Sequence, residues 1–130
     1  MRQFPFQRDQ RLLTPSEYKS VFDHVDVRVS HSGFLFLAHI TEPTLRGRLG
    51  LVVSKKNVKK AVERNRFKRL VRDTFRINQD NLFGLDIVVL ARNGVTEMSN
   101  PELIQALQKS WIKLKKRSMA DNSVKKASNL

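Results

Sequence analysis

Residues 58–76 constrain the fold more than any other segment, because they combine one core-facing side with one strongly basic side. On a helical wheel of about 100° per residue, five side chains suited to a core gather on one face. They are Phe67, Leu70, Val71, Thr74 and Phe75. Such a helix packs one face on a hydrophobic core and leaves the other open. Short apolar segments at residues 49–54 and 85–92 flank it, so the three segments predict a βαβ unit with parallel strands.

The remaining segments predict an α+β domain around this unit. Thr14-Pro15-Ser16-Glu17 has the sequence of a helix start, with a capping box between its first and last residues. Residues 25–31 alternate apolar and polar side chains like a half-exposed strand, and residues 34–41 predict a second strand. Residues 99–102 predict the start of a last helix. The expected order is αβββαβα, folded as a two-layer α–β sandwich with a small mixed sheet.

The chain of 130 residues is long enough for one domain, which we expect to span residues 1–118. Within it, residues 1–13 predict an extended basic arm, and residues 119–130 predict a polar basic tail without fixed structure. The absence of cysteine excludes disulfides and thiolate metal sites. Residues 1–13 do not have the pattern of a signal peptide, and every apolar run is far shorter than the ~20 residues that span a bilayer. We therefore expect a cytoplasmic protein with no membrane contact.

The positive charge is concentrated in the central helix and in the residues just before it. Residues 55–76 hold ten basic and two acidic residues, a net charge of +8 in a chain of net charge +13. Arg64, Lys68 and Arg72 repeat at intervals of four, where like charges repel by a few tenths of a kcal/mol per pair. A solvated helix normally mixes the two signs. Cations without nearby acids therefore predict an anionic partner outside the chain.

Nucleic acid is the partner that this basic face favours. A solvated basic face without a ligand is one alternative, and an anionic membrane surface is another. The membrane is disfavoured because the apolar side of the helix is needed by the core. RNA is favoured over DNA because the sequence has no helix-turn-helix, zinc-finger or dimerising-zipper pattern. Contacts between such cations and phosphates give affinity with a steep salt dependence.

The sequence predicts no catalytic site in the protein itself. His24, His31 and His39 are spread along the chain without a partner spacing, and a histidine acid–base pair is a minor alternative. The acidic residues are scattered and suggest no two-metal site, and no glycine-rich phosphate loop occurs. Asp86, at the start of an apolar segment, is expected to be a buried partner of an arginine or lysine. We expect no cofactor or metal bound by the protein's side chains.

Two motifs resemble the protein subunit of bacterial ribonuclease P. Ser54-Lys55-Lys56 ends the strand before the basic helix, and the helix then reads R-N-R-F-K-R-L-V-R from Arg64 to Arg72. That family has a strand ending in Ser-Lys-Lys, followed by a helix with Arg-Asn-Arg spacing of this kind. The Leu12-Leu13-Thr14-Pro15-Ser16 segment before the first helix also fits. The resemblance covers about the first 118 residues.

The resemblance implies both a fold and a function. The fold is an α–β sandwich whose βαβ crossover has the rare left-handed form, where strand rules alone predict a right-handed one. The function is that of the protein subunit of ribonuclease P, which assists the removal of the 5′ leader from precursor tRNA. Catalysis lies in the RNA subunit, with Mg²⁺ bound there. The implied partners are ribonuclease P RNA, at one protein per RNA, and the leader of precursor tRNA.

The resemblance also implies which residues bind each RNA. The contacts expected with the catalytic RNA are Lys55, Lys56, Lys60, Arg64, Asn65, Arg66, Lys68, Arg69 and Arg72. Tyr18, Phe22, Phe36 and Lys68 are expected to line a cleft for the leader. Single-stranded RNA stacks its bases on aromatic rings in cationic grooves, at roughly 1–3 kcal/mol per stack. A core position is the alternative for each of the three rings. Leu37 stands where some family members have tyrosine, so the contact of that tyrosine is not implied here.

Two other functions fit part of the sequence. A ribosome-associated structural RNA-binding protein would have the same basic composition. A stand-alone nuclease would need catalytic side chains that come together only in the folded chain. Cleavage of precursor tRNA with and without the matching RNA separates these three functions.

Overall fold

The computed structural model describes residues 10–128, and the side chains of residues 10–120. Its helices and strands follow the predicted order αβββαβα, with two short 3-10 helices between them. They are α1 (Pro15–Asp23), β1 (Val27–Ser30), β2 (Phe34–Ile40), β3 (Arg48–Val52), α2 (Ala61–Asn78), η2 (Gln79–Asn81), β4 (Leu85–Ala91), η3 (Asn93–Glu97) and α3 (Asn100–Ser128). None of the described helices is both long enough and apolar enough to cross a membrane.

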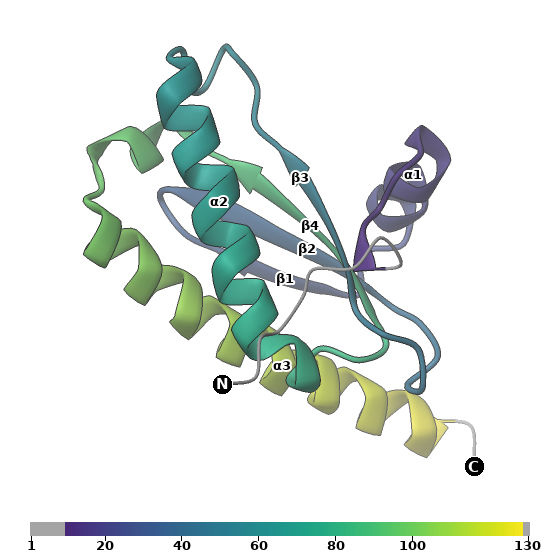
Figure 1. Cartoon of the computed structure of the whole chain (residues 1–130). Helices are drawn as coiled ribbons and strands as arrows, with labels where there is room; N and C mark the ends of the chain where they lie inside the picture. The colour runs from purple at the N-terminus through teal and green to yellow at the C-terminus, as the bar shows by residue number, and fades with distance from the viewer. Residues whose placement is uncertain (1–9, 129–130) are drawn as a thin grey trace, which may run out of the picture.

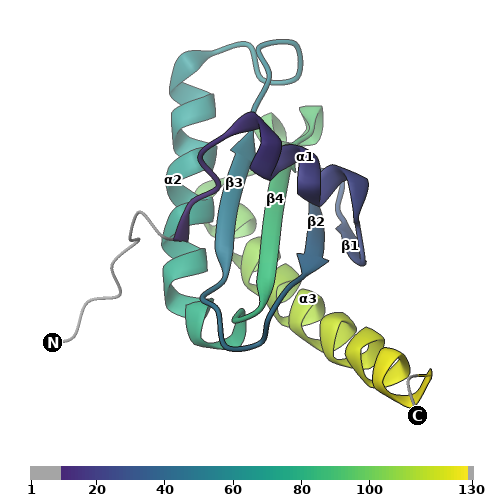
Figure 2. The ribbon, with the colours of Figure 1, turned by 90° about the vertical axis from the view of Figure 1, so that its right-hand side faces the viewer.

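The four strands form one mixed sheet with helices on both faces. The strand order is β1-β2-β4-β3, in which β3 and β4 are parallel and the other pairs are antiparallel. Helices α2 and α3 cover one face, and α1 lies on the other (Figure 1; Figure 2). The sheet with α2 and α3 is the predicted α–β sandwich, to which α1 adds a partial third layer. β3 is an edge strand, so the α1 side and the α2 side of the sheet meet at its outer border.

The βαβ crossover is left-handed. α2 connects β3 to its parallel neighbour β4. In Figure 2, where α1 is nearest the viewer, β3 and β4 run upward, α2 returns behind the sheet, and β4 lies to the right of β3. This path turns with the hand that is rare for parallel strands. The expectation taken from the family resemblance is therefore confirmed.

The alternation of side chains along β2 divides the interior into two hydrophobic clusters. Phe36 and Ala38 join the large cluster with α2 and α3, whereas Leu37 joins the small cluster with α1. Trp111 of α3 belongs to the large cluster, and its ring centroid lies 4.4 Å from that of Phe36. The indole N–H of Trp111 donates to Thr74 Oγ1 at 2.9 Å, which satisfies its buried polar group. This cluster fixes α2 and α3 on the sheet.

The predicted helix starts are confirmed at α1 and α3 but not at α2. Thr14 and Glu17 form the capping box of α1, and Ser99 and Glu102 bond each other's backbone N–H in the same way at α3. α2 begins at Ala61 rather than at residue 58. The residues before it form a turn, in which the Val58 N–H donates to Ser54 O at 2.9 Å.

The structure differs from the sequence prediction at the end of the chain. α3 continues to Ser128, whereas a polar tail without fixed structure was predicted from residue 119. That segment has no glycine or proline to end a helix. The helix therefore continues beyond the apolar repeat of its sequence. Of the predicted N-terminal arm, residues 1–9 lie outside the described residues, and the Leu12 N–H donates to Leu49 O of β3 at 3.1 Å.

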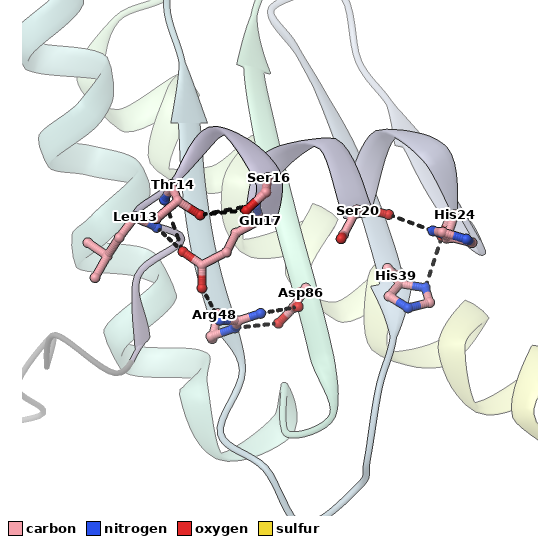
Figure 3. Close-up of polar contacts among 9 residues, drawn as sticks. All are labelled: Leu13, Thr14, Ser16, Glu17, Ser20, His24, His39, Arg48 and Asp86. Carbon is pink, nitrogen blue, oxygen red and sulfur yellow. Dashed lines mark hydrogen bonds and ion pairs between the residues drawn. The ribbon is translucent and has the colours of Figure 1, made fainter.

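A network of ion pairs joins α1 to the sheet (Figure 3). Arg48 Nε and Nη2 donate to the two carboxylate oxygens of Asp86 at 2.9 and 2.7 Å. This confirms the predicted pairing of Asp86 with a basic residue, and Asp86 raises the pKa of Arg48 further. Arg48 Nη1 also donates to Glu17 Oε2 at 2.6 Å. The backbone N–H groups of Leu13 and Thr14 donate to Glu17 Oε1, and these two bonds, followed by Arg48, lower the pKa of Glu17.

Glu17→Gln is expected to remove a pH-dependent contribution to stability at the start of α1. The folded chain lowers the pKa of Glu17, so its ionised form stabilises the fold above the ordinary carboxyl range. This contribution is lost as the pH falls through the lowered pKa. The variant should therefore be less stable than the native chain at pH 7, and the difference should shrink as the pH falls below the ordinary carboxyl range and through the lowered pKa. Urea unfolding across this pH range measures the difference, and a difference independent of pH would contradict the prediction.

Candidate RNA interface

α2 presents its basic side chains away from the core, as the helical wheel predicted. The five core-facing residues of the helix are buried, with Leu70 the most exposed at 6%. Most of the residues predicted to contact the catalytic RNA lie open to solvent. The exposed ones are Lys55, Lys56, Lys60, Asn65, Arg69 and Arg72, and the half-buried ones are Arg64, Arg66 and Lys68.

The two acidic residues of this segment pair with only two of its ten basic residues. Glu63 pairs with Arg66 at 2.9 Å, and Asp73 pairs with Arg76. Among residues 10–120, none of the other eight cations forms an ion pair with a carboxylate. The charge of +8 predicted for residues 55–76 thus stays uncompensated within the described part of the chain. This positive charge forms an electrostatic site for a polyanion.

Arg64 holds the loop between β3 and α2 in place. Its Nη1 donates to Val58 O at 3.0 Å and to Lys59 O at 2.8 Å. Both acceptors are uncharged carbonyl oxygens, so the positive charge of the guanidinium is not neutralised. Arg64 therefore positions the loop and adds to the positive potential, and its direct contact with RNA stays a prediction.

Arg66 has a structural role, and its contact with RNA stays a prediction. Its Nε and Nη2 donate to Glu63 Oε2 at 3.1 and 2.9 Å. Its Nη1 donates to Asn100 Oδ1 at 2.9 Å, and Nη2 also donates to Val95 O at 3.1 Å. The side chain is 16% exposed and its charge is paired. Arg66 thus joins α2 to η3 and α3, through partners 29 and 34 residues away that the sequence did not reveal.

α1 carries two aromatic rings on the side of the sheet opposite α2. The Tyr18 ring lies on Gly50, where a Cβ atom would come within 2.7 Å of the ring carbons. The Tyr18 hydroxyl accepts the backbone N–H of Leu51 at 3.2 Å, so the ring is partly fixed on edge strand β3. Phe22, one helical turn later, is 43% exposed. The ring of Phe22 is therefore open for stacking with a base, whereas only part of the Tyr18 ring is open.

The prediction that Phe36 lines the leader cleft is wrong. Phe36 is fully buried and packs against Trp111 of α3. Successive side chains of a strand point to opposite faces of the sheet, and that alternation sends Phe36 away from α1. Its neighbour Leu37 faces α1 instead and is 6% exposed.

Lys68 is separated from the two aromatic rings by the sheet. It belongs to α2, whereas Tyr18 and Phe22 belong to α1 on the other face (Figure 2). A strand of RNA that contacts both helices would have to cross edge strand β3. The contribution of Lys68 to the leader cleft stays a prediction.

Two histidines that are distant in the sequence come together beside α1. The ring centroids of His24 and His39 lie 5.3 Å apart. His39 Nδ1 contacts His24 O at 3.0 Å, and His24 Nδ1 contacts Ser20 O at 3.0 Å (Figure 3). His39 Nδ1 also contacts Asp26 Oδ2 at 2.9 Å. Sequence reasoning missed the pair because 15 residues separate its members. Within the described residues, no group of three or more His, Cys, Asp or Glu side chains could hold a metal ion.

Comparison of the sequence with known proteins gives one family. The Ribonuclease P family model matches residues 6–115. The ribonuclease P protein component of Pseudomonas entomophila (strain L48) is 52% identical over 112 residues, which cover 84% of this chain and 81% of that protein. The same component of Pseudomonas putida (strain GB-1) is 51% identical with the same coverage.

Solved structures of the same kind share the fold. The RNase P protein from Staphylococcus aureus has a TM-score of 0.70 and 24% identity, and the match covers 85% of this chain and 92% of that one. The RNase P protein from Thermotoga maritima has a TM-score of 0.56 and 26% identity, with coverage of 84% and 97%. The relatives in sequence and the neighbours in structure are therefore proteins of one kind.

Proposed function

The chain belongs to the ribonuclease P protein family, and from this membership we propose that it is the protein component of ribonuclease P. It binds the catalytic RNA of that enzyme and the 5′ leader of precursor tRNA, and so assists the endonucleolytic removal of the leader. The observation that carries the proposal is the set of eight cations in residues 55–76 without a carboxylate partner. A phosphate backbone is the anion that matches a row of cations along a rigid helix.

The catalytic RNA binds along the exposed side of α2 and the loop before it. Contacts with phosphates set the position and orientation of a protein on RNA without reading its sequence. The residues that fit this task are Lys55, Lys56, Lys60, Asn65, Lys68, Arg69 and Arg72. The buried face of α2 supports the assignment of Asn65, Lys68, Arg69 and Arg72, because it holds these side chains at fixed spacing on the sheet.

The 5′ leader binds on the α1 side, where Phe22 and part of Tyr18 are open for base stacking. β3 lies at the edge of the sheet, so an RNA strand that crosses it can reach both α1 and Lys68. This path supports a contact of one RNA strand with both helices.

The chemistry of leader removal is assigned to the RNA partner, with its Mg²⁺ ions. The protein contributes positive charge, which lowers the repulsion between the catalytic RNA and the precursor tRNA. One protein acts with one RNA, in the cytoplasm. The enzyme is thus the endoribonuclease holoenzyme, of which this chain is the protein part.

Cleavage of precursor tRNA tests the proposed function. The protein together with ribonuclease P RNA should cleave at low Mg²⁺ concentration, where neither component alone gives product. Cleavage by the protein alone would show that the protein is a stand-alone nuclease. If the protein does not support cleavage by the RNA and instead co-sediments with ribosomal subunits, it is a ribosome-associated protein.

Phe22→Ala is expected to weaken holoenzyme binding of precursor tRNA about tenfold, through loss of one base stack. Binding of mature tRNA, which has no leader, should stay unchanged. Phe83→Ala is a matched control, because Phe83 is 40% exposed and belongs to the loop before β4. Tyr18→Ala should act in the same direction as Phe22→Ala. Equal losses of affinity for precursor and mature tRNA would contradict the binding of the leader on the α1 side.

A further inference from the structure

A cavity of about 530 Å³ lies between η3 and the loop that joins β3 to α2. The loop contributes Lys56, Lys59 and Lys60 to its wall, and η3 contributes Asn93, Thr96 and Glu97. Its volume falls within the range of about 300–1,000 Å³ that is usual for sites of small ligands. The cavity therefore has room for one nucleotide.

Both walls of the cavity are fastened to the protein by hydrogen bonds. Arg64 fixes the loop through Val58 O and Lys59 O, and Arg66 fixes η3 through Val95 O. Asn57, which also lines the cavity, donates from Nδ2 to Ala91 O at 3.2 Å at the end of β4. The two arginines stand on the same helix, so α2 sets the distance between the walls. A site held in this way loses little entropy when a ligand binds.

The charges in the cavity have two signs, and only part of them is compensated. The three lysines have no ion pair within the described residues, and Glu63, which also lines the cavity, is neutralised by Arg66. Glu97 is exposed and likewise has no ion pair among these residues. A free carboxylate would repel a phosphate bound alone. Beside three lysines, it fits a ligand that has both a phosphate and hydrogen-bond donors.

A nucleotide of RNA combines a phosphate with such donors on its base. Guanine presents two adjacent donors, N1–H and the N2 amino group, which can bond both oxygens of one carboxylate. Adenine and cytosine place a ring acceptor beside their amino group, and uracil flanks its N3–H with carbonyl oxygens. Proteins read unpaired RNA bases through these Watson–Crick edges. A carboxylate in the cavity wall therefore selects guanine.

We propose that this cavity binds one unpaired guanine nucleotide of the catalytic RNA, an inference that rests on the proposed function. The phosphate lies against Lys56, Lys59 and Lys60, and the base donates to the Glu97 carboxylate. Asn93 and Thr96 supply further polar groups beside the base. Arg64 and Arg66 are positioning residues for this site, because they hold its two walls.

Titration of the ¹⁵N-labelled full chain with mononucleotides tests the site directly. GMP, IMP, AMP and inorganic phosphate are added separately, and IMP matches GMP except for the missing N2 amino group. GMP should shift the amide signals of Asn93, Thr96 and Glu97 and bind about tenfold more tightly than IMP, because a hydrogen bond to a charged group is lost. Inorganic phosphate should shift only the signals of the lysine loop. Equal shifts with all four ligands would overturn the proposal.

Glu97→Gln separates this site from general electrostatic attraction. The variant should lose the preference for GMP over IMP and still respond to phosphate. It should also bind ribonuclease P RNA about tenfold more weakly, although the removal of a negative charge favours RNA binding in general. Glu42→Gln is the control, because Glu42 is exposed, has no ion pair within the described residues and lies outside this cavity. Its RNA affinity should equal that of the native chain or exceed it slightly.

The outcomes also distinguish the two proposals. Native affinity of Glu97→Gln for ribonuclease P RNA, or an unchanged preference for GMP, would overturn the guanine site and leave the proposed function intact. Failure of the native chain to bind ribonuclease P RNA would overturn the proposed function itself.

Discussion

Replacement of Lys68, Arg69 and Arg72 together by glutamine is expected to weaken binding of ribonuclease P RNA about 100-fold at ~0.15 M salt. None of the three side chains has an ion pair among the described residues, so their charges are available to phosphates. Each phosphate contact releases about one counterion, which contributes somewhat less than a factor of ten at this salt concentration. The fold should be unaffected, because Arg69 and Arg72 are exposed, Lys68 is half-buried without an ion pair, and substitutions of this kind change stability by about 0.5 kcal/mol or less.

A control with the same loss of charge distinguishes local contacts from net charge. Lys109, Lys113 and Lys116 of α3 are exposed. Their positions on the helical wheel place them on the side of α3 that faces away from α2. Their triple replacement by glutamine should weaken RNA binding by less than about fivefold. Filter binding or fluorescence anisotropy measures both variants, and equal losses would mean that the α2 side chains do not touch the RNA.

Arg66→Ala is expected to lower the free energy of unfolding by about 3 kcal/mol, which corresponds to a fall in Tm of roughly 10 °C. The substitution removes the bonds to Glu63, Asn100 and Val95, and leaves the Glu63 carboxylate without its ion pair. Because these bonds join α2 to η3 and α3, the loss affects packing between segments that are far apart in the sequence. Urea unfolding measures the change.

Arg69→Ala is the matched control for stability, since Arg69 stands on the same helix and is exposed. Its free energy of unfolding should stay within about 0.5 kcal/mol of the native value. A similar small effect for Arg66→Ala would show that the Arg66 side chain is not structural.

The helix α2 could be predicted from the sequence because its two faces follow directly from the 3.6-residue period. The same holds for the starts of α1 and α3, where Thr14 with Glu17 and Ser99 with Glu102 form local bonds within four residues. The left-handed crossover could not be predicted from local rules, which favour the other hand. Only the family resemblance pointed to it.

What the sequence could not show at the candidate site depends on contacts that are not local. The partners of Arg66 beyond α2 were not visible in the helical wheel. Phe36 was assigned to the leader cleft although the face of β2 on which α1 packs was unknown from the sequence. The closeness of His24 and His39 likewise depends on the path of the chain from α1 to β2.

The central claim is that the uncompensated cations of residues 55–76 bind RNA phosphates. The salt dependence of binding to ribonuclease P RNA tests this claim most directly. The logarithm of the binding constant should fall linearly with the logarithm of salt concentration, with a slope of about −5 for six or more contacts. In the Lys68, Arg69 and Arg72 triple variant the slope should be shallower by about two to three. A slope near zero for the native chain, or the same slope for both chains, would contradict the account.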